Sequence, residues 1–231
     1  MKSKIALWCF FVIAFAELYG EVLQNVKIIY FTKPLLMISL STYFFCSTIQ
    51  NRSHFSIFLL LGLIFSIGGD TFLMFDGSLY FMLGLGCFLI THVLYIVAFL
   101  KYESLSKGLI RQKIGLVFPF LLYLVGILSY LWQDLGDMMI PVIIYSTVIC
   151  LMSITALNLK LTLPKGVFTM LFSGVLLFMF SDSIIALTKF KHDTLTIPYH
   201  HVVIMTTYIM AQYLIVESTI MINRDISKAL V

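Results

Sequence analysis

Apolar residues gather in eight long runs along the chain, and charges and turn formers fill the short stretches between them. The runs show no period-two alternation and come near the roughly 20 residues that a helix needs to cross a bilayer. No hydrophilic stretch is long enough for a separate soluble domain. The pattern therefore predicts an all-α membrane bundle in a single transmembrane domain, residues 1–231, with helices near 5–20, 30–50, 54–75, 79–100, 113–133, 138–160, 166–189 and 198–222.

The composition supports a membrane protein and excludes a water-soluble one. Hydrophobic residues make up 61% of the chain and charged residues 11%, whereas a soluble domain carries about a quarter charged residues. The net charge of +4 gives no reason to expect a nucleic-acid partner, since basic residues in a membrane protein mainly set its orientation. The four cysteines fall within apolar runs and lack paired spacing, which disfavours disulfides and a zinc site.

Basic residues fall unequally on the two sides of the predicted bundle. When both termini and the second, fourth and sixth connections share one side, that side holds eleven of the 15 lysines and arginines. The positive-inside rule then places both termini in the cytoplasm. We expect an integral multi-pass protein of the endoplasmic reticulum membrane in a eukaryote, or of the inner membrane in a bacterium. The eleven are Lys2, Lys4, Arg52, Lys101, Lys107, Arg111, Lys113, Lys160, Lys165, Arg224 and Lys228, and the other four are Lys27, Lys33, Lys189 and Lys191.

The N-terminal segment has two interpretations. Two lysines precede an apolar stretch that ends in the small-residue pattern Ala14-Phe15-Ala16, as in a cleavable signal peptide. Cleavage there would remove one helix from the bundle. We favour a retained first helix that ends near Tyr19, and N-terminal sequencing of the mature protein tests this choice.

Two aspartates stand at the ends of matching apolar runs. Asp70 follows the run 61–69, and Asp182 follows the run 174–181. A carboxylate within a membrane span is costly, so each is a candidate functional residue. Both lie about two turns from the same end of the bundle, so they can face each other at one depth. Small residues on the same helix faces indicate that both point inward; these are Gly62, Ser66 and Gly69 near Asp70, and Gly174 and Ser181 near Asp182.

Other polar residues are predicted to surround this pair. Lys33 can keep one carboxylate ionised or bind a phosphate headgroup. The histidine, tyrosine and glutamine side chains nearby can orient substrate or water, although hydrogen bonding between helices explains their presence equally well. The histidines lack the spacing of a metal site. Glu17 lies near a predicted helix end and is expected to reach the headgroup region. The candidate substrate-binding residues are Lys33, His92, Tyr145, Tyr208 and Gln212.

The two carboxylates are suited to divided roles. In an apolar site, their mutual repulsion favours one neutral acid beside one ionised carboxylate. Such a pair can protonate an acetal-like bond and stabilise an oxocarbenium-type state. The same residues would serve as the proton relay of a proton-coupled transporter, in a lipid-binding protein, or as a polar pair that only joins helices. The residues alone leave these classes open, while the lack of a Gly-x-Ser-x-Gly motif disfavours a serine hydrolase.

A series of short motifs follows the predicted helices two to eight. They are Thr32-Lys33-Pro34-Leu35-Leu36-Met37, Phe65-Ser66-Ile67-Gly68-Gly69-Asp70-Thr71-Phe72-Leu73-Met74, Phe81-Met82-Leu83-Gly84-Leu85 with His92 and Tyr95, Pro141-Val142-Ile143-Ile144-Tyr145, Ser181-Asp182, Thr207-Tyr208 and Ala211-Gln212. No motif is specific alone, but in order and spacing the chain resembles the YhhN-like lysoplasmalogenase family.

The resemblance implies a multi-pass hydrolase of the vinyl ether bond of lysoplasmalogens. Its products would be a fatty aldehyde and glycerophosphoethanolamine or glycerophosphocholine, with no metal or other cofactor required. Vinyl ether hydrolysis begins with protonation at carbon, and this chemistry agrees with Asp70 and Asp182 as an acid/base pair whose individual roles are unassigned. The expected partners are the lysophospholipid substrate and membrane lipids, with the headgroup preference and the oligomeric state left open.

Overall fold

The computed structural model describes residues 2–50, 53–191 and 195–229, and this part of the chain contains helices and no strand. Eight of its helical segments are long and apolar enough to span a membrane, which confirms the predicted all-α membrane bundle. The long helices are α1 (Lys2–Leu23), α2 (Val26–Thr48), α3 (His54–Leu73), α4 (Ser78–Tyr102), α6 (Phe118–Leu131), α7 (Met139–Asn158), α8 (Lys165–Phe190) and α9 (His200–Ala229).

Short helical turns extend or connect these spans. The 3-10 helices η1 (Ile114–Val117) and η2 (Trp132–Asp134) flank α6, and η3 (Gly136–Met138) and η4 (Leu159–Leu161) flank α7. The four-residue helix α5 (Leu109–Gln112) was not predicted. It is held by the buried Asn158, whose Oδ1 accepts from the Ile110 N–H at 3.0 Å and whose Nδ2 donates to the Ser104 carbonyl at 3.2 Å.

The start of α2 differs from the prediction. The helix begins at Val26 rather than near residue 30, because Asn25 caps it. The Asn25 side chain accepts hydrogen bonds from the backbone N–H groups of Lys27 at 3.2 Å and Ile28 at 3.4 Å, which satisfies two donors of the first turn. A tight turn through Gln24, at φ 51°, therefore joins α1 directly to α2.

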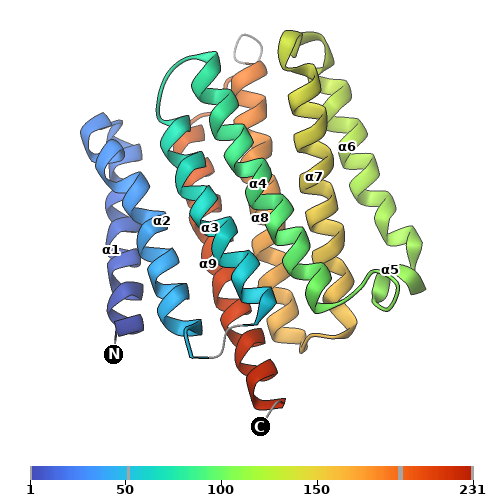
Figure 1. Ribbon diagram of the computed structural model, residues 1–231. Helices are drawn as coiled ribbons and strands as arrows, with labels where there is room; N and C mark the ends of the chain where they lie inside the picture. The colour runs from blue at the N-terminus through green and yellow to red at the C-terminus, as the bar shows by residue number, and fades with distance from the viewer. Residues whose placement is uncertain (1, 51–52, 192–194, 230–231) are drawn as a thin grey trace.

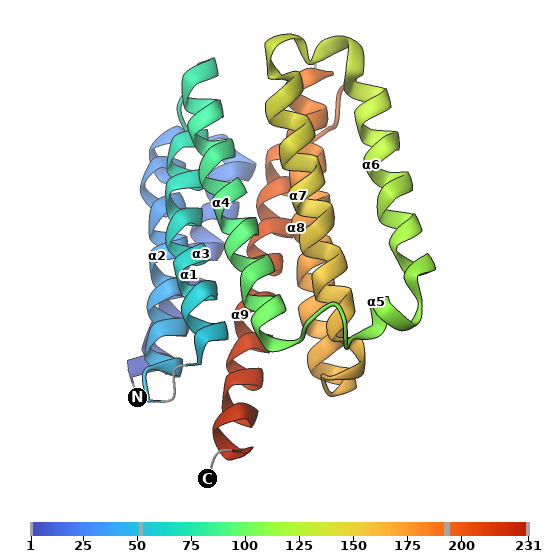
Figure 2. The same cartoon turned by 45° about the vertical axis from the view of Figure 1, so that its right-hand side comes forward.

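The long helices run side by side, and both chain ends lie at the same end of the bundle (Figure 1). Helix α1 packs on α2, α3 on α4, α8 on α9, and α4 also packs on α7. Helix α6 lies outermost, beyond α7 (Figure 2). A cytoplasmic position for the termini stays a prediction. It was based on eleven basic residues, of which Arg52 and the side chains of Lys2 and Lys228 lie outside the described part of the chain.

Glycines allow the closest helix contacts. A Cβ on Gly62 of α3 would lie 2.4 Å from the Tyr95 ring of α4, and one on Gly69 would lie 2.6 Å from the Phe88 ring. On α8, a Cβ on Gly174 would lie 2.9 Å from the Ala211 carbonyl oxygen of α9. Small residues therefore bring α3 onto α4 and α8 onto α9, which confirms that these faces point inward.

Candidate active site

Asp70 belongs to a hydrogen-bonded network that joins α3, α4 and α9. Its side chain is buried, and its Oδ2 accepts from the Tyr208 hydroxyl at 2.9 Å. Gln212, one turn further along α9, donates from Nε2 to the Tyr208 oxygen at 3.3 Å and to Ser66 Oγ at 3.1 Å. The Gln212 Oε1 accepts from the Tyr95 hydroxyl at 2.8 Å. Gln212 thus fixes Tyr208, and Tyr208 fixes Asp70.

Asp182 has a different set of partners, from α4 and α7. Its Oδ2 accepts from the Tyr145 hydroxyl at 2.5 Å and lies 3.2 Å from His92 Nε2. His92 is fully buried, and its Nδ1 has no hydrogen-bond partner. A buried N–H without an acceptor is costly, so the proton of a neutral His92 belongs on Nε2, where Asp182 Oδ2 at 3.2 Å and the Tyr145 hydroxyl oxygen at 3.0 Å share it. Asp182 therefore receives two hydrogen bonds.

Aromatic rings separate the two networks. The Phe88 ring meets Phe178 at 6.0 Å and Tyr208 at 5.7 Å, both edge to face, and Phe178 also meets His92 at 4.7 Å. Within the described residues, no hydrogen bond joins the two carboxylates. They are brought together instead by a cavity whose wall contains both.

A polar cavity of about 330 Å³ lies at the end of the bundle opposite the termini. Its wall includes both members of the aspartate pair and residues of the loop between α3 and α4. Charged and titratable side chains make up much of the lining, in contrast to the apolar surface of the helices. They are Lys33, Asp70, Asp76, Asp182, Lys189, His200, His201 and Tyr208.

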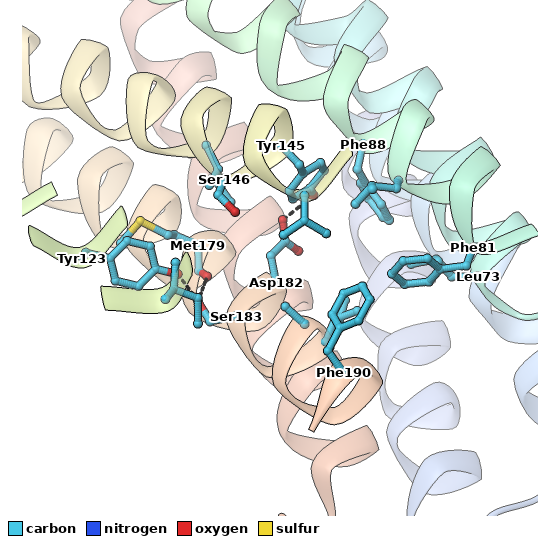
Figure 3. A pocket seen from close by; sticks show the side chains of 16 residues that line it. Leu73, Phe81, Phe88, Tyr123, Tyr145, Ser146, Met179, Asp182, Ser183 and Phe190 are labelled. Carbon is cyan, nitrogen blue, oxygen red and sulfur yellow. Dashed lines mark hydrogen bonds between the residues drawn. The ribbon is translucent and has the colours of Figure 1, made fainter. Parts of the chain in front are cut away.

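A second, smaller cavity of about 50 Å³ adjoins the first and is almost entirely apolar. It lies among α4, α6, α7 and α8, with Tyr123, Tyr145 and Met179 in its wall (Figure 3). Asp182 lines both cavities, as do the apolar residues Leu73, Phe81, Phe88 and Ile185. The Asp182 carboxylate is therefore placed where a polar space meets an apolar one.

Lys33 points into the polar cavity from α2, but its ion-pair partners lie on α1. Its ammonium is 3.0 Å from Glu21 Oε1 and 3.5 Å from Glu17 Oε1. Glu17 is fully buried and accepts a hydrogen bond from the Thr32 hydroxyl, so the expectation that it reaches the headgroup region was wrong. The pairing with Lys33 and Thr32 allows this carboxyl group to lie inside the bundle.

The predicted site residues therefore fall into two groups. Asp70, Asp182, Lys33, Tyr145 and Tyr208 line one or both cavities. His92 and Gln212 are fully buried behind that wall, where they contact a wall residue rather than the cavities.

Some residues near the site were not among the predicted site residues. Asp76, His200 and His201 line the polar cavity, and Glu21 pairs with Lys33. Glu17 and Glu21 lie one helical turn apart on α1, which continues to Leu23 rather than ending near Tyr19 as predicted, so Glu21 fell just beyond the predicted span. Among the described residues, no three His, Cys, Asp or Glu side chains come together in a way that could hold a metal ion.

An eight-span bundle with two aspartates at a polar and an apolar cavity is an integral multi-pass membrane protein with an amphipathic internal site. The chain belongs to the YhhN family, whose sequence model matches residues 28–219. The matched region starts in α2 and includes both aspartates.

Curated relatives support the same family. The chain is 34% identical over 168 residues to the human protein named lysoplasmalogenase TMEM86A, and this match covers 70% of the chain and 65% of that protein. A match of the same coverage to the Bos taurus lysoplasmalogenase TMEM86A has 35% identity. Human lysoplasmalogenase TMEM86B is 33% identical over 68% of the chain and 61% of its own length. The matched region thus falls just short of two thirds of each relative, and no solved structure matches the chain.

Proposed function

We propose that this chain is a lysoplasmalogenase, a hydrolase that cleaves the vinyl ether bond of alkenyl-lysophospholipids to a fatty aldehyde and a glycerophospho-alcohol. The relatives named lysoplasmalogenase support this reaction class. The observation that carries the proposal is the position of Asp182 at the junction of a polar and an apolar cavity. In a lysoplasmalogen, the vinyl ether bond lies at the same kind of junction, between an alkenyl chain and a glycerophosphate headgroup.

The hydrogen bonds support different roles for the two aspartates. Asp182 accepts from the Tyr145 hydroxyl and from His92, and two donors stabilise an ionised carboxylate. Asp70 is more deeply buried and accepts from one hydroxyl, that of Tyr208. A neutral carboxylic acid is more easily accommodated there than a charge. We therefore assign Asp70 as the acid and Asp182 as the base.

The first step is proton transfer from the Asp70 carboxyl group to the vinyl carbon that does not carry oxygen. The double-bond electrons form the new C–H bond, and the adjacent carbon becomes an oxocarbenium ion. The ionised Asp182 stabilises this cation electrostatically. Asp70 is left as a carboxylate, to which Tyr208 still donates.

Water then completes the hydrolysis. Asp182 accepts a proton as the water oxygen attacks the cationic carbon, which gives a neutral hemiacetal. The protonated Asp182 next donates to the glycerol oxygen while Asp70 takes the hemiacetal hydroxyl proton, and the C–O bond to glycerol breaks. An aldehyde and the glycerophospho-alcohol leave, one water is consumed, and both aspartates return to their starting states.

The test is aldehyde release by the purified protein in detergent. A lysoplasmalogen is the substrate, and the 1-alkyl lysophospholipid of the same length, which lacks the double bond, is the matched control. We expect trapped aldehyde from the first lipid and none from the second. A protein that released no aldehyde from the vinyl ether, but moved protons or lipid across sealed liposomes, would belong to the transporter class instead.

A further inference from the structure

The polar cavity contains more charged groups than the cleavage chemistry uses. Of its three carboxylates, Asp70 and Asp182 accept hydrogen bonds from tyrosines within the bundle. Asp76 lies on the loop between α3 and α4, where its side chain is exposed. Within the described part of the chain, Asp76 forms no hydrogen bond or ion pair, so its carboxylate is available to a ligand.

Lys33 supplies a fixed positive charge on the same wall. Its side chain is 16% exposed, and the ammonium is held by Glu21 at 3.0 Å and Glu17 at 3.5 Å. Glu17 is itself held by the Thr32 hydroxyl. An ammonium has three N–H donors, so two carboxylate partners leave one donor for a third acceptor. The cavity is where that acceptor can lie, because Lys33 lines it.

Asp70, Lys33 and Asp76 become more exposed in that order. Asp70 is 4% exposed as a residue, the Lys33 side chain is 16% exposed, and Asp76 is an exposed residue. A lysophospholipid has the matching order of vinyl ether bond, phosphate and terminal amine. Its reacting bond at the aspartate pair would leave the phosphate and then the amine along the cavity toward the loop.

Resting on the proposed function, we infer that the polar cavity is a headgroup site in which Lys33 donates to the phosphate and Asp76 accepts from the terminal ammonium. Glu17 and Glu21 are positioning residues that hold Lys33 in place. The cavity, at about 330 Å³, falls within the size range of small-molecule sites. The matched family region begins at residue 28, so the α1 carboxylates that position Lys33 lie outside it.

This site has a direct consequence for headgroup selection. The ammonium of ethanolamine carries three N–H donors, whereas the quaternary ammonium of choline carries none. Asp76 can hydrogen-bond to the first and has only electrostatic attraction for the second. The headgroup site therefore favours ethanolamine over choline.

The experiment measures kcat/KM for four substrates that share one alkenyl chain. They are the lysophosphoethanolamine, the lysophosphocholine, the lysophosphatidic acid, which lacks the amine, and the 1-alkenylglycerol, which also lacks the phosphate. For Asp76→Asn, we expect kcat/KM for the ethanolamine lipid to fall up to about fivefold relative to the lysophosphatidic acid, as for an exposed ion pair. The control is Asp137→Asn, an exposed acid in η3 that does not line the cavity. An unchanged ratio in Asp76→Asn would overturn the amine assignment.

The phosphate assignment is tested by Lys33→Met with the same four substrates. The ratio of kcat/KM for the lysophosphatidic acid to that for the 1-alkenylglycerol should fall about 10- to 100-fold, the value of a hydrogen bond to a charged group. Lys27→Met, at an exposed position on α2 outside the cavity, is the control. An equal loss on all four substrates would contradict the assignment.

Lys33→Met could fail to fold, because it leaves the carboxyl groups of Glu17 and Glu21 inside the bundle without their cation. A second variant keeps the test decisive in that case. Lys33→Met combined with Glu17→Gln and Glu21→Gln removes the whole charged cluster, and the same ratio should fall equally.

Binding separates the failure of the headgroup site from the failure of the proposed function. The uncleavable 1-alkyl analogues of the ethanolamine lipid and the lysophosphatidic acid are titrated against the purified protein. Weaker binding of the ethanolamine analogue to Asp76→Asn supports the headgroup site even if no aldehyde forms. If the parent protein and Asp76→Asn bind the ethanolamine analogue equally, the headgroup site is overturned even if cleavage is observed.

Discussion

Asp70 and Asp182 carry the same side chain at the ends of similar apolar runs, yet the structure surrounds them differently. Asp70 accepts from Tyr208 within a network on α3, α4 and α9, and it faces the polar cavity only. Asp182 accepts from Tyr145 and His92, and it lines the polar and the apolar cavity. Similar sequence contexts therefore produced two chemically distinct positions.

The difference supports the proposed assignment of one aspartate as acid and the other as base. The number of donors that reach a carboxylate decides which protonation state its surroundings stabilise. The rings of Phe88 and Phe178 lie between the two hydrogen-bond networks and keep them apart. The proposed division of roles depends on that separation, and the following predictions test it.

The largest effect is expected from removing either carboxylate. Asp70→Asn and Asp182→Asn should each lower kcat for aldehyde release by about 10²- to 10⁴-fold, because each removes a proton-transfer group. Added formate or azide should restore part of the activity of Asp182→Asn, since a small anion can replace a missing base. It should not restore Asp70→Asn, which lacks an acid.

The opposite pattern of rescue would exchange the two roles. Full activity in either variant would remove that aspartate from the mechanism. The thermal midpoint of each purified variant, compared with that of the parent protein, is the control for folding.

An intermediate effect is expected from the two tyrosines. Tyr145→Phe removes a hydrogen bond to Asp182, assigned as ionised, and should lower kcat about 10- to 100-fold. Tyr208→Phe removes a hydrogen bond to Asp70, assigned as neutral, and should lower kcat about 2- to 10-fold. Both changes delete a single hydroxyl, so each is the control for the other. Equal losses, or a larger loss in Tyr208→Phe, would contradict the assigned protonation states.

The smallest effect is expected on stability, from adding a methyl group next to the Phe88 ring. An added methyl group in Gly69→Ala would lie 2.6 Å from the Phe88 ring, and the free energy of unfolding should fall by about 1–3 kcal/mol. Gly86→Ala on α4 meets nothing within 4 Å, and it should leave stability unchanged or raise it by up to about 1 kcal/mol. Unfolding in mixed detergent measures both, and equal stability of the two variants would show that Phe88 can move freely.

Much of the fold could be predicted because its signal is local. The spans were recognised from runs of apolar residues, and the predicted limits 54–75 agree closely with α3 (His54–Leu73). Where the prediction differed, a side-chain contact was the cause. Asn25 starts α2 early, and Asn158 holds the unpredicted helix α5.

The sequence predicted some of the residues that line the cavities, including Asp70, Asp182 and Lys33, but not their hydrogen bonds and ion pairs. Intramembrane acids are rare enough that Asp70 and Asp182 could be singled out directly. Glu17 was misjudged, because a place near a helix end does not reveal that Lys33 and Thr32 of the next helix enclose it. The pairing of Lys33 with α1 could not be derived either, since an ammonium near several carboxylates has no partner fixed by spacing.

By itself, the sequence determined that this chain has eight helices long and apolar enough to cross a membrane and that two of them carry an aspartate, because the cost of placing polar groups in hydrocarbon acts on each segment separately. Only the tertiary structure decided which donors reach which acid, as with Tyr208 and Asp70, 138 residues apart, and His92 and Asp182, 90 residues apart. It also decided that Asp182 lies between two cavities of opposite polarity. Those outcomes depend on how each helix is rotated against its neighbours, and that rotation is set by side-chain packing across the whole bundle.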